Sequence, residues 1–321
     1  MPRVLLFGAG SVGSIYVYVL SRAGADVTAV CRSNYTAVKQ NGFFIDSSIF
    51  GENIDIKPNV VRTPAEAEGK FDYIVVCSKA LLSNSPSIPS LVKPVISSNT
   101  TIVLIQNGVG IESEFSSAFP SNPILSCVVY LPVTQTRPGI ISHGHDERLE
   151  VGTYPSNAPR EHKGRAEAFA GLVTAGGATA QVFEDIQPRR WRKTIINAAW
   201  NPICALTHLN DVDFLASSLG AVTLMEDVMV EVVSVARALG YSEVTQEVAE
   251  AQLQRAKQRM KGIEPSMLGD VREGRRMEVE AILGNVVRFG QEKGVTTPLL
   301  TMLYCLTKGL EESIVRRHEE Q

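Results

Sequence analysis

A six-residue glycine motif near the start of the sequence limits the fold most strongly. Residues 8–13 read GAGSVG, a complete G-x-G-x-x-G pattern. An apolar run that begins at Arg3 leads into the motif and a helical pattern that ends at Gly24 follows it, as in a βαβ unit of about 30 residues. Its glycines allow a tight turn, close approach of the backbone to a pyrophosphate, and helix–strand packing. The motif therefore predicts a dinucleotide site formed by Gly8, Ala9, Gly10, Ser11, Val12 and Gly13, with a glycine turn that binds nothing as the alternative.

The end of the next expected strand, residues 26–32, indicates which dinucleotide is bound. Dinucleotide folds that take NAD usually have an acidic residue here, which binds the ribose 2′-hydroxyl. This chain has Arg32 followed by Ser33 and Asn34, with no acid. An arginine pairs well with a 2′-phosphate, and the missing carboxylate removes a repulsion. We expect NADP(H); a surface arginine without a ligand is the alternative.

The order of the predicted elements indicates two domains. Up to about residue 123, short apolar runs alternate with helical segments, which is typical of a parallel sheet with crossover helices. A hairpin is expected over residues 43–56, and shorter strands with a turn at residues 137–139 follow later. From Gln187 onward the pattern is almost wholly helical. The prediction is an α/β N-terminal Rossmann-type dinucleotide-binding domain with extra strands over residues 1–185, followed by an all-α C-terminal substrate and catalytic domain over residues 186–321.

Bulk composition excludes several classes of partner. The chain of 321 residues has a formal net charge of −3 and is 44% hydrophobic, so no strong field favours nucleic acid. No apolar run approaches the roughly 18 residues of a membrane span. The 5 cysteines have no paired spacing, which argues against disulfides and zinc sites. We expect a cytoplasmic protein without a bound metal, a nucleic-acid partner or a membrane contact.

One predicted helix carries an unusual polar series. The stretch WRKTIINAAWNP places Lys193, Asn197 and Asn201 four residues apart among apolar neighbours. Four residues turn a helix by about 400°, so successive members drift by only about 40° and share one side. Buried polar groups need hydrogen-bond partners. The three side chains therefore either satisfy one another and nearby backbone or face a polar ligand.

Several motifs in combination resemble the ketopantoate reductase (2-dehydropantoate 2-reductase) family. They are GAGSVG, Arg32, VCSKA with Lys79, QNGVG with Asn107, WRKTIINAAWNPICAL, and PSMLGDVREGRRMEVEAILG with Ser266 and Glu278. The matching pieces span nearly the whole chain. The resemblance implies NADPH-dependent reduction of a 2-oxo acid, most directly of 2-dehydropantoate to pantoate in pantothenate biosynthesis.

The resemblance also implies roles for individual residues. Lys193 matches the catalytic lysine, whose ammonium donates a proton to the keto oxygen; a lysine with its ordinary pKa of about 10.4 is protonated at neutral pH. Glu278 matches an acid that orients the lysine and binds substrate. The remaining matches are the substrate-binding residues Asn107, Asn197, Asn201 and Ser266, and the cofactor-facing residues Lys79 and Asn107.

Two departures from the family leave the substrate open. The stretch after Lys79 lacks the aromatic or glutamine residues expected there, and His143 and His145 replace a simpler glycine-rich turn. The sequence therefore also allows a reductase of another small carbonyl compound, and a non-catalytic NADP(H)-sensing protein as a different class. It leaves open the stereochemistry and whether the C-terminal helices pack within one subunit or across a homodimer.

Overall fold

The computed structural model describes residues 1–82 and 85–319 and separates the chain into two compact units. Unit 1 comprises Met1–Lys79, Asn84–Gln106 and Ile111–Ile186, and unit 2 comprises Ala80–Ser83, Asn107–Gly110 and Gln187–Gln321. Unit 2 thus includes two short segments from the first half of the sequence.

The large sheet of unit 1 has eight strands in the order β12-β11-β8-β7-β6-β1-β2-β5. Its strands are β1 (Arg3–Phe7), β2 (Asp26–Val30), β5 (Asn59–Val61), β6 (Tyr73–Val76), β7 (Thr101–Ile105), β8 (Ile124–Tyr130), β11 (Arg148–Thr153) and β12 (Ala180–Val182). Strands β6 and β7 are buried along their whole length, as expected where helices cover both faces.

The sheet is mixed rather than wholly parallel, because β11 runs antiparallel to β8. Arg148 at the start of β11 pairs with Tyr130 at the end of β8, so the chain re-enters the sheet at the edge where it left. No helical crossover intervenes. The excursion instead builds β9 (Val133–Arg137) and β10 (Ile140–His143) of a second sheet.

That second sheet has the order β4-β3-β10-β9. Strands β3 (Phe43–Ser47) and β4 (Gly51–Ile56) pair antiparallel, which confirms the hairpin expected over residues 43–56. Strand β10 pairs parallel with β3 and antiparallel with β9. Two regions far apart in the sequence thus form one small sheet.

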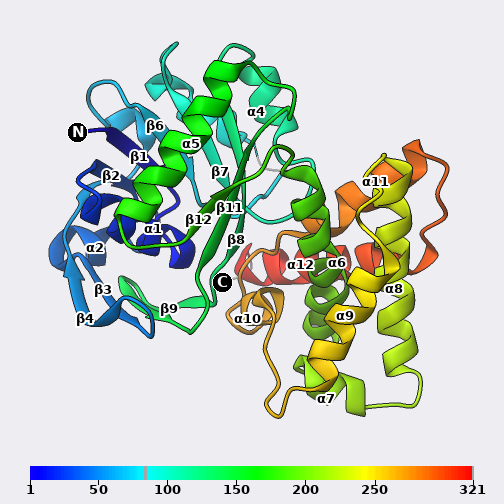
Figure 1. Cartoon of the computed structure of the whole chain (residues 1–321). Coiled ribbons are helices and arrows are strands. Elements are labelled where there is room, and N and C mark those ends of the chain that lie inside the picture. The colour runs from blue at the N-terminus through cyan, green and yellow to red at the C-terminus, as the bar shows by residue number, and fades with distance from the viewer. Residues whose placement is uncertain (83–84, 320–321) are drawn as a thin grey trace. The chain divides into compact units, whose positions relative to one another are not determined.

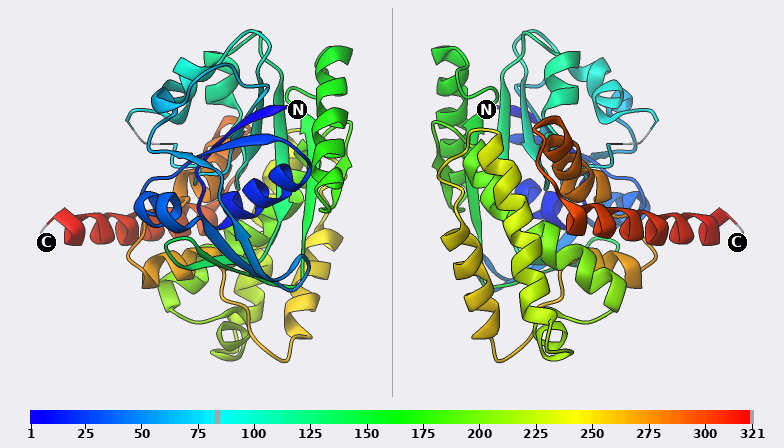
Figure 2. Two further views of the ribbon diagram at one scale, coloured as in Figure 1. Left: turned by 90° about the vertical axis from the view of Figure 1, so that its left-hand side faces the viewer. Right: turned by 90° about the vertical axis from the view of Figure 1, so that its right-hand side faces the viewer.

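Helices cover both faces of the large sheet (Figures 1 and 2). Helices α1 (Ser11–Arg22) and α5 (Arg160–Ala175) pack against each other on one face. The opposite face carries α3 (Ile88–Val92) and α4 (Ser113–Ala118), which also contact each other. The remaining helical pieces of the unit are α2 (Tyr35–Asn41), η1 (Pro64–Glu66) and η2 (Lys93–Val95).

Within the described residues, all regular secondary structure of unit 2 is helical. Its elements are α6 (Gln187–Thr207), α7 (Asp211–Ala216), α8 (Ala221–Ala238), α9 (Gln246–Lys257), α10 (Ser266–Arg272), the π-helical turn η3 (Glu280–Gly284), α11 (Asn285–Glu292) and α12 (Pro298–Glu319). The expected fold class, a Rossmann-type domain followed by a helical domain, is confirmed. None of the described helices combines the length and the apolar character that crossing a membrane requires.

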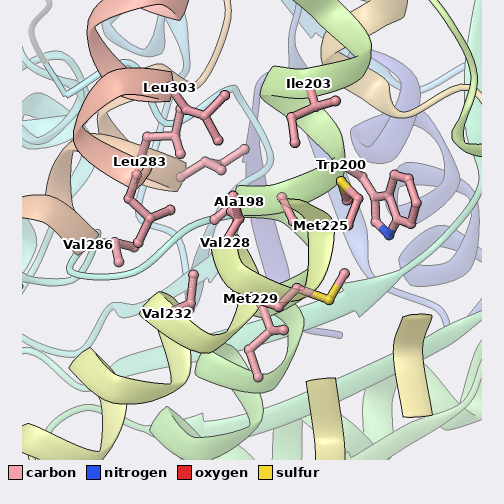
Figure 3. Packing of buried hydrophobic residues seen from close by; sticks show 14 of the residues in the cluster. Ala198, Trp200, Ile203, Met225, Val228, Met229, Val232, Leu283, Val286 and Leu303 are labelled. Carbon is pink, nitrogen blue, oxygen red and sulfur yellow. The ribbon is translucent and has the colours of Figure 1, made fainter. Parts of the chain in front are cut away.

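The core of unit 2 forms around α6 and α8 (Figure 3). Side chains of both helices meet there with those of η3, α11 and α12, among them Ala198, Met225, Val228, Val286 and Leu303. Met225 and Val228 are fully buried. Each such side chain stabilises the fold by about 1.5–3 kcal/mol, so this core holds α6, and with it the polar series, in a fixed orientation.

Candidate active site

The glycine loop of unit 1 (residues 8–13) has the shape that its sequence predicts. Gly8 has a φ of +94°, and a Cβ added there would lie 2.4 Å from the backbone nitrogen of Ser78. A Cβ at Gly13 would lie 2.3 Å from the carbonyl oxygen of Gly8. A Cβ at Gly10 would meet no atom within 4 Å. The outer glycines are therefore required for close packing, whereas the middle one faces open space.

The N-terminus of α1 suits an anion. Its N-cap is Gly10, no side chain caps it, and its first turn carries no acidic residue. The unpaired N–H groups and the positive end of the helix dipole attract phosphate. The hydroxyl of Ser11 accepts a hydrogen bond from the backbone nitrogen of Gln135 at 3.0 Å, so this side chain also ties the loop to β9.

Asn34 supports the same loop, a role that sequence reasoning missed. Asn34 directly precedes α2, but its side chain makes no capping bond to that helix. Its Nδ2 donates to the carbonyl oxygen of Ala9 at 2.8 Å and to Oε1 of Gln135 at 2.9 Å. The buried amide thus links the loop to β9. Only the structure brings Gln135 to this place, because it lies 101 residues further along the chain.

Arg32 lies two residues beyond β2, and its side chain is exposed. The neighbouring strand β5 supplies a second guanidinium, Arg62, which directly follows Val61, the partner of Val30 in the sheet register. The Arg62 guanidinium lies 4.1 Å from the ring centroid of Tyr35. Sequence reasoning did not select Arg62. The end of a parallel neighbour strand is the signal that indicates it.

Lys79 is half-buried and lies three residues beyond β6, at the end of a segment of unit 1. The stretch after it differs from the family pattern, and residues 83–84 of that stretch lie outside the described residues.

In unit 2, helix α6 carries Lys193, Asn197 and Asn201, as predicted. Lys193 and Asn197 are half-buried, and Asn201 is buried with 3% of its surface exposed. The three residues have different environments. In the described part of the chain no side-chain hydrogen bond of Asn197 is found, whereas the other two contact protein groups.

Lys193, Asn107 and Glu278 form a connected group, which we call the Lys193 network. The Lys193 ammonium donates to Oδ1 of Asn107 at 2.9 Å. Nδ2 of the same amide donates to Oε2 of Glu278 at 3.1 Å. Asn107 therefore bridges the cation and the carboxylate, and its orientation is fixed by having a donor on one side and an acceptor on the other.

The Glu278 carboxylate is buried, with 8% of the residue exposed, and both oxygens are used. Oε1 accepts a hydrogen bond from the backbone nitrogen of Ala80 at 2.9 Å, and Oε2 accepts the bond from Asn107. Within the described residues, Glu278 does not contact Lys193 directly. The amide of Asn107 links it to the lysine, a detail that the resemblance did not provide.

Asn201 and Ser266 lie together, but their contacts are with protein. Oδ1 of Asn201 accepts hydrogen bonds from the backbone nitrogen of Met267 at 3.1 Å and from the Ser266 hydroxyl at 3.3 Å. The amide oxygen thus satisfies the start of α10, where helix N–H groups lack partners. The exposed Ser266 is fixed next to α6 as a result.

Arg190 is a further buried residue of α6 that sequence reasoning missed. Only 2% of it is exposed, and its Nη1 donates to the carbonyl oxygen of Gly108 at 2.8 Å. It therefore supports the backbone next to Asn107. Its position one helical turn before Lys193 was the available signal, but a surface arginine would look the same in the sequence.

The carboxylate that follows Glu278 on the same segment is strongly paired. Burial acts to raise the pKa of Glu280, but hydrogen bonds from Arg288 and Tyr304, both at 2.9 Å, and the charge of Lys308 outweigh it and lower that pKa. Tyr304 and Lys308 belong to α12. These contacts join the start of η3 to α11 and α12.

His143 lies in unit 1, in the second sheet, and has a structural environment. Its Nδ1 lies 2.8 Å from Oγ of Ser47, which already accepts hydrogen bonds from the backbone nitrogens of Ile49 and Phe50. The Ser47 hydroxyl therefore donates to Nδ1, and Nε2 carries the proton toward the carbonyl oxygen of Asp146 at 3.0 Å. Both ring nitrogens are occupied by protein groups in a neutral imidazole.

Comparison with known proteins finds relatives along most of the chain. A family model described as ketopantoate reductase PanE/ApbA matches residues 4–156, and the model of its C-terminal part matches residues 185–311. The chain is 31% identical over 319 residues to a 2-dehydropantoate 2-reductase of Pyrobaculum aerophilum, with 97% of this chain and 98% of the relative covered.

Solved structures give the same result. The crystal structure of 2-dehydropantoate 2-reductase from Methylococcus capsulatus is 34% identical, with a TM-score of 0.84 and 97% of each chain covered. A solved ternary structure of D-mandelate dehydrogenase with NADH and anilino(oxo)acetate has a TM-score of 0.85 at 21% identity, with 97% of this chain and 99% of that chain covered. The latter likeness is one of fold.

Proposed function

Because the chain belongs to the ketopantoate reductase family, whose members are dinucleotide-dependent oxidoreductases acting on CH–OH groups, we propose that it reduces 2-dehydropantoate to pantoate with NADPH. Pantoate as product assigns the enzyme to pantothenate biosynthesis. The observation that carries the proposal is the Lys193 network, which joins one cation, one amide and one buried carboxylate.

The residues of unit 1 fit a dinucleotide. The glycine loop leaves open space at Gly10, and the N-terminus of α1 lacks a side-chain cap, so its N–H groups are suited to hold a pyrophosphate. Arg32 would pair with the 2′-phosphate, with Arg62 as a second cation from β5. When bound, the reduced nicotinamide supplies the hydride for the reaction.

Lys193 acts as general acid and as electrostatic stabiliser in this proposal. An ammonium has three N–H donors, and Asn107 accepts one of them. Another of the three is directed to the keto oxygen of the substrate. Negative charge develops on that oxygen as the carbonyl is reduced, and the nearby cation stabilises it before the proton moves.

Asn107 and Glu278 keep the ammonium in position. The buried carboxylate accepts from Asn107 Nδ2, which leaves the Oδ1 of the same amide directed at Lys193. Asn197, one turn along α6, offers an amide to a substrate oxygen, and the Ser266 hydroxyl lies beside Asn201 at the start of α10. Neutral groups suit the several oxygens of a small oxo acid.

The test follows NADPH absorbance with 2-dehydropantoate and a panel of other 2-oxo acids. The variant Lys193→Ala is expected to lose about 10²- to 10⁴-fold in kcat, the usual range for a general acid, while its Kd for NADPH stays within about threefold. Arg192→Ala, which removes the adjacent cation of α6, is the matched control and should keep its rate. Equal kcat values for the two variants would reject the role of Lys193.

A reductase of another small carbonyl compound is the second candidate. The fold is shared with a D-mandelate dehydrogenase structure that holds NADH, so fold alone decides neither the keto acid nor the nucleotide. The substrate panel separates the candidates: a kcat/KM for another 2-oxo acid at least about tenfold above that for 2-dehydropantoate favours the second. Absence of turnover with every acid, despite tight NADPH binding, favours a sensor.

A further inference from the structure

The loop that carries Asn107, which we call the Asn107 loop (residues 107–110), is held by Ala281 in η3 and by Asn285 at the start of α11. The backbone nitrogen of Val109 donates to the carbonyl oxygen of Ala281 at 3.0 Å. Nδ2 of Asn285 donates to the carbonyl oxygen of Val109 at 2.6 Å. Val109 is 1% exposed, so both of its backbone groups are satisfied by protein out of contact with water.

The acceptor at Ala281 exists because the helix is wound as a π-turn there. In an α-helix the N–H of Asn285 would bond to the carbonyl of Ala281, four residues earlier. In η3 this N–H bonds instead to the carbonyl of Glu280. The shift leaves the Ala281 carbonyl available to Val109. Such π-turns are rare and are often found at functional sites.

The contact between the loop and η3 also requires a glycine. Gly108 has a φ of +89°, and a Cβ there would lie 2.3 Å from the Ala281 carbonyl oxygen. Any other residue would push the loop away from η3. Glu278, which accepts a hydrogen bond from the Asn107 side chain, lies two residues before η3. One short segment therefore binds both the side chain of Asn107 and the backbone that follows it.

We propose that η3 and Asn285 form a clamp that positions Asn107, so that its amide can bridge Lys193 and Glu278. Asn285 is a positioning residue, because it contacts the loop and acts through Asn107. The kinetic consequence rests on the proposed function, in which Lys193 is the acid. A displacement of about 1 Å at a catalytic group typically costs about 10²-fold in rate.

The variant Asn285→Asp tests the clamp. It replaces the donor to Val109 by an oxygen that repels the carbonyl, yet keeps the acceptor that Arg288 Nη2 reaches at 2.5 Å. We expect kcat to fall about 10- to 100-fold, with a Kd for NADPH within about threefold of wild type. Asn285→Ala, which adds no repulsion, is the second variant should the first fold poorly, and should change in the same direction.

Arg288→Met is the matched control. It removes bonds to Glu280 and to Oδ1 of Asn285 but leaves the Asn285–Val109 bond intact. Its kcat should stay within about threefold of wild type. A control that loses as much rate as Asn285→Asp would show that the effect comes from general loosening of α11, and would overturn the proposal.

Hydrogen exchange supplies a readout that does not depend on turnover. The Val109 amide should exchange faster in Asn285→Asp, and should keep its wild-type protection in Arg288→Met. Unchanged exchange in Asn285→Asp rejects the clamp, and faster exchange with an unchanged kcat rejects its role in positioning. If the wild-type protein reduces no 2-oxo acid, the proposed function fails, and the exchange comparison alone decides whether the clamp exists.

Discussion

The glycine loop of unit 1 acts through its backbone, whereas the Lys193 network of unit 2 is formed mainly by side chains. The loop consists of six consecutive residues that act through their backbone. What it requires of the sequence is steric, because a side chain at Gly8 or Gly13 would clash with neighbouring atoms. The network joins side chains and backbone separated by 86 to 198 positions. A local motif can be recognised in the sequence, whereas the geometry of a network appears only after the helices of unit 2 have packed.

After the loss expected for Lys193→Ala, the largest expected effect tests the other end of the network. In Glu278→Gln the side chain offers one oxygen and one donor group, although both Ala80 and Asn107 direct donors at this position. We expect kcat to fall about 100-fold because Asn107 turns away from Lys193. Stopped-flow measurement of NADPH oxidation checks this.

The control is Glu280→Gln, because Glu280 bonds to Arg288 and Tyr304 rather than to the network. It should retain most of the wild-type kcat. A Glu278→Gln enzyme as fast as this control would mean that the buried carboxylate has only a structural role.

The next effect tests the steric nature of the glycine loop. Gly8→Ala places a Cβ 2.4 Å from Ser78 at a positive φ and should destabilise the fold by at least about 2 kcal/mol. Gly10→Ala meets no atom within 4 Å and should leave Tm unchanged, but weaken NADPH binding about tenfold. Calorimetry and fluorescence titration measure the two effects. Equal Tm losses in both variants would contradict the assignment of open space at Gly10.

A smaller effect concerns the choice of nucleotide. Arg32→Ala should raise the Kd for NADPH about tenfold, the range of one charge-assisted hydrogen bond, and leave the Kd for NADH unchanged. The exposed Arg32 has no part in the core, so the fold should be unaffected. Arg62→Ala is the comparison variant, because Arg62 follows β5, the strand next to the one that Arg32 follows. If Arg32→Ala weakens NADH and NADPH equally, the arginine does not read the 2′-phosphate.

The smallest effect is a pH dependence in the second sheet. Burial lowers the pKa of His143, although the contacts with Asp146 oppose it, so the folded state favours neutral imidazole. The stabilisation is present above the unfolded pKa of about 6.5 and is lost as pH falls through the lowered folded pKa. The Tm of wild type should therefore fall relative to that of His143→Gln below about pH 6.5, by a few degrees at most. Parallel Tm curves for the two proteins would refute this.

The sequence predicts the glycine loop, which acts through its backbone, better than the Lys193 network, which is formed mainly by side chains. The motif at residues 8–13, the hairpin at residues 43–56 and the helix that carries Lys193 follow from periodicity and glycine positions. The antiparallel direction of β11 could not be predicted from the sequence, because it depends on where the chain re-enters the sheet. The role of Asn34 was missed because its partners, Ala9 in the glycine loop and Gln135 in β9, lie 25 and 101 residues away.

The polar series of α6 shows the same limit within one helix. Spacing correctly placed Lys193 and Asn201 on it, but spacing does not distinguish their partners. The oxygen of Asn201 binds the start of α10, as expected of a polar group satisfied by its own protein. Lys193 instead joins Asn107, which comes from a segment 86 residues away. Tertiary packing therefore decides the partners of two positions that look alike in the sequence.

A crystal structure of the wild-type protein with NADP⁺ and pantoate tests most directly whether Lys193 is the general acid. In that complex Lys193 Nζ should lie about 2.6–3.2 Å from the hydroxyl oxygen on the reacting carbon, while its bond to Asn107 is kept. A lysine that stays beyond about 5 Å, with another proton donor at that oxygen, would contradict the role of Lys193 as general acid.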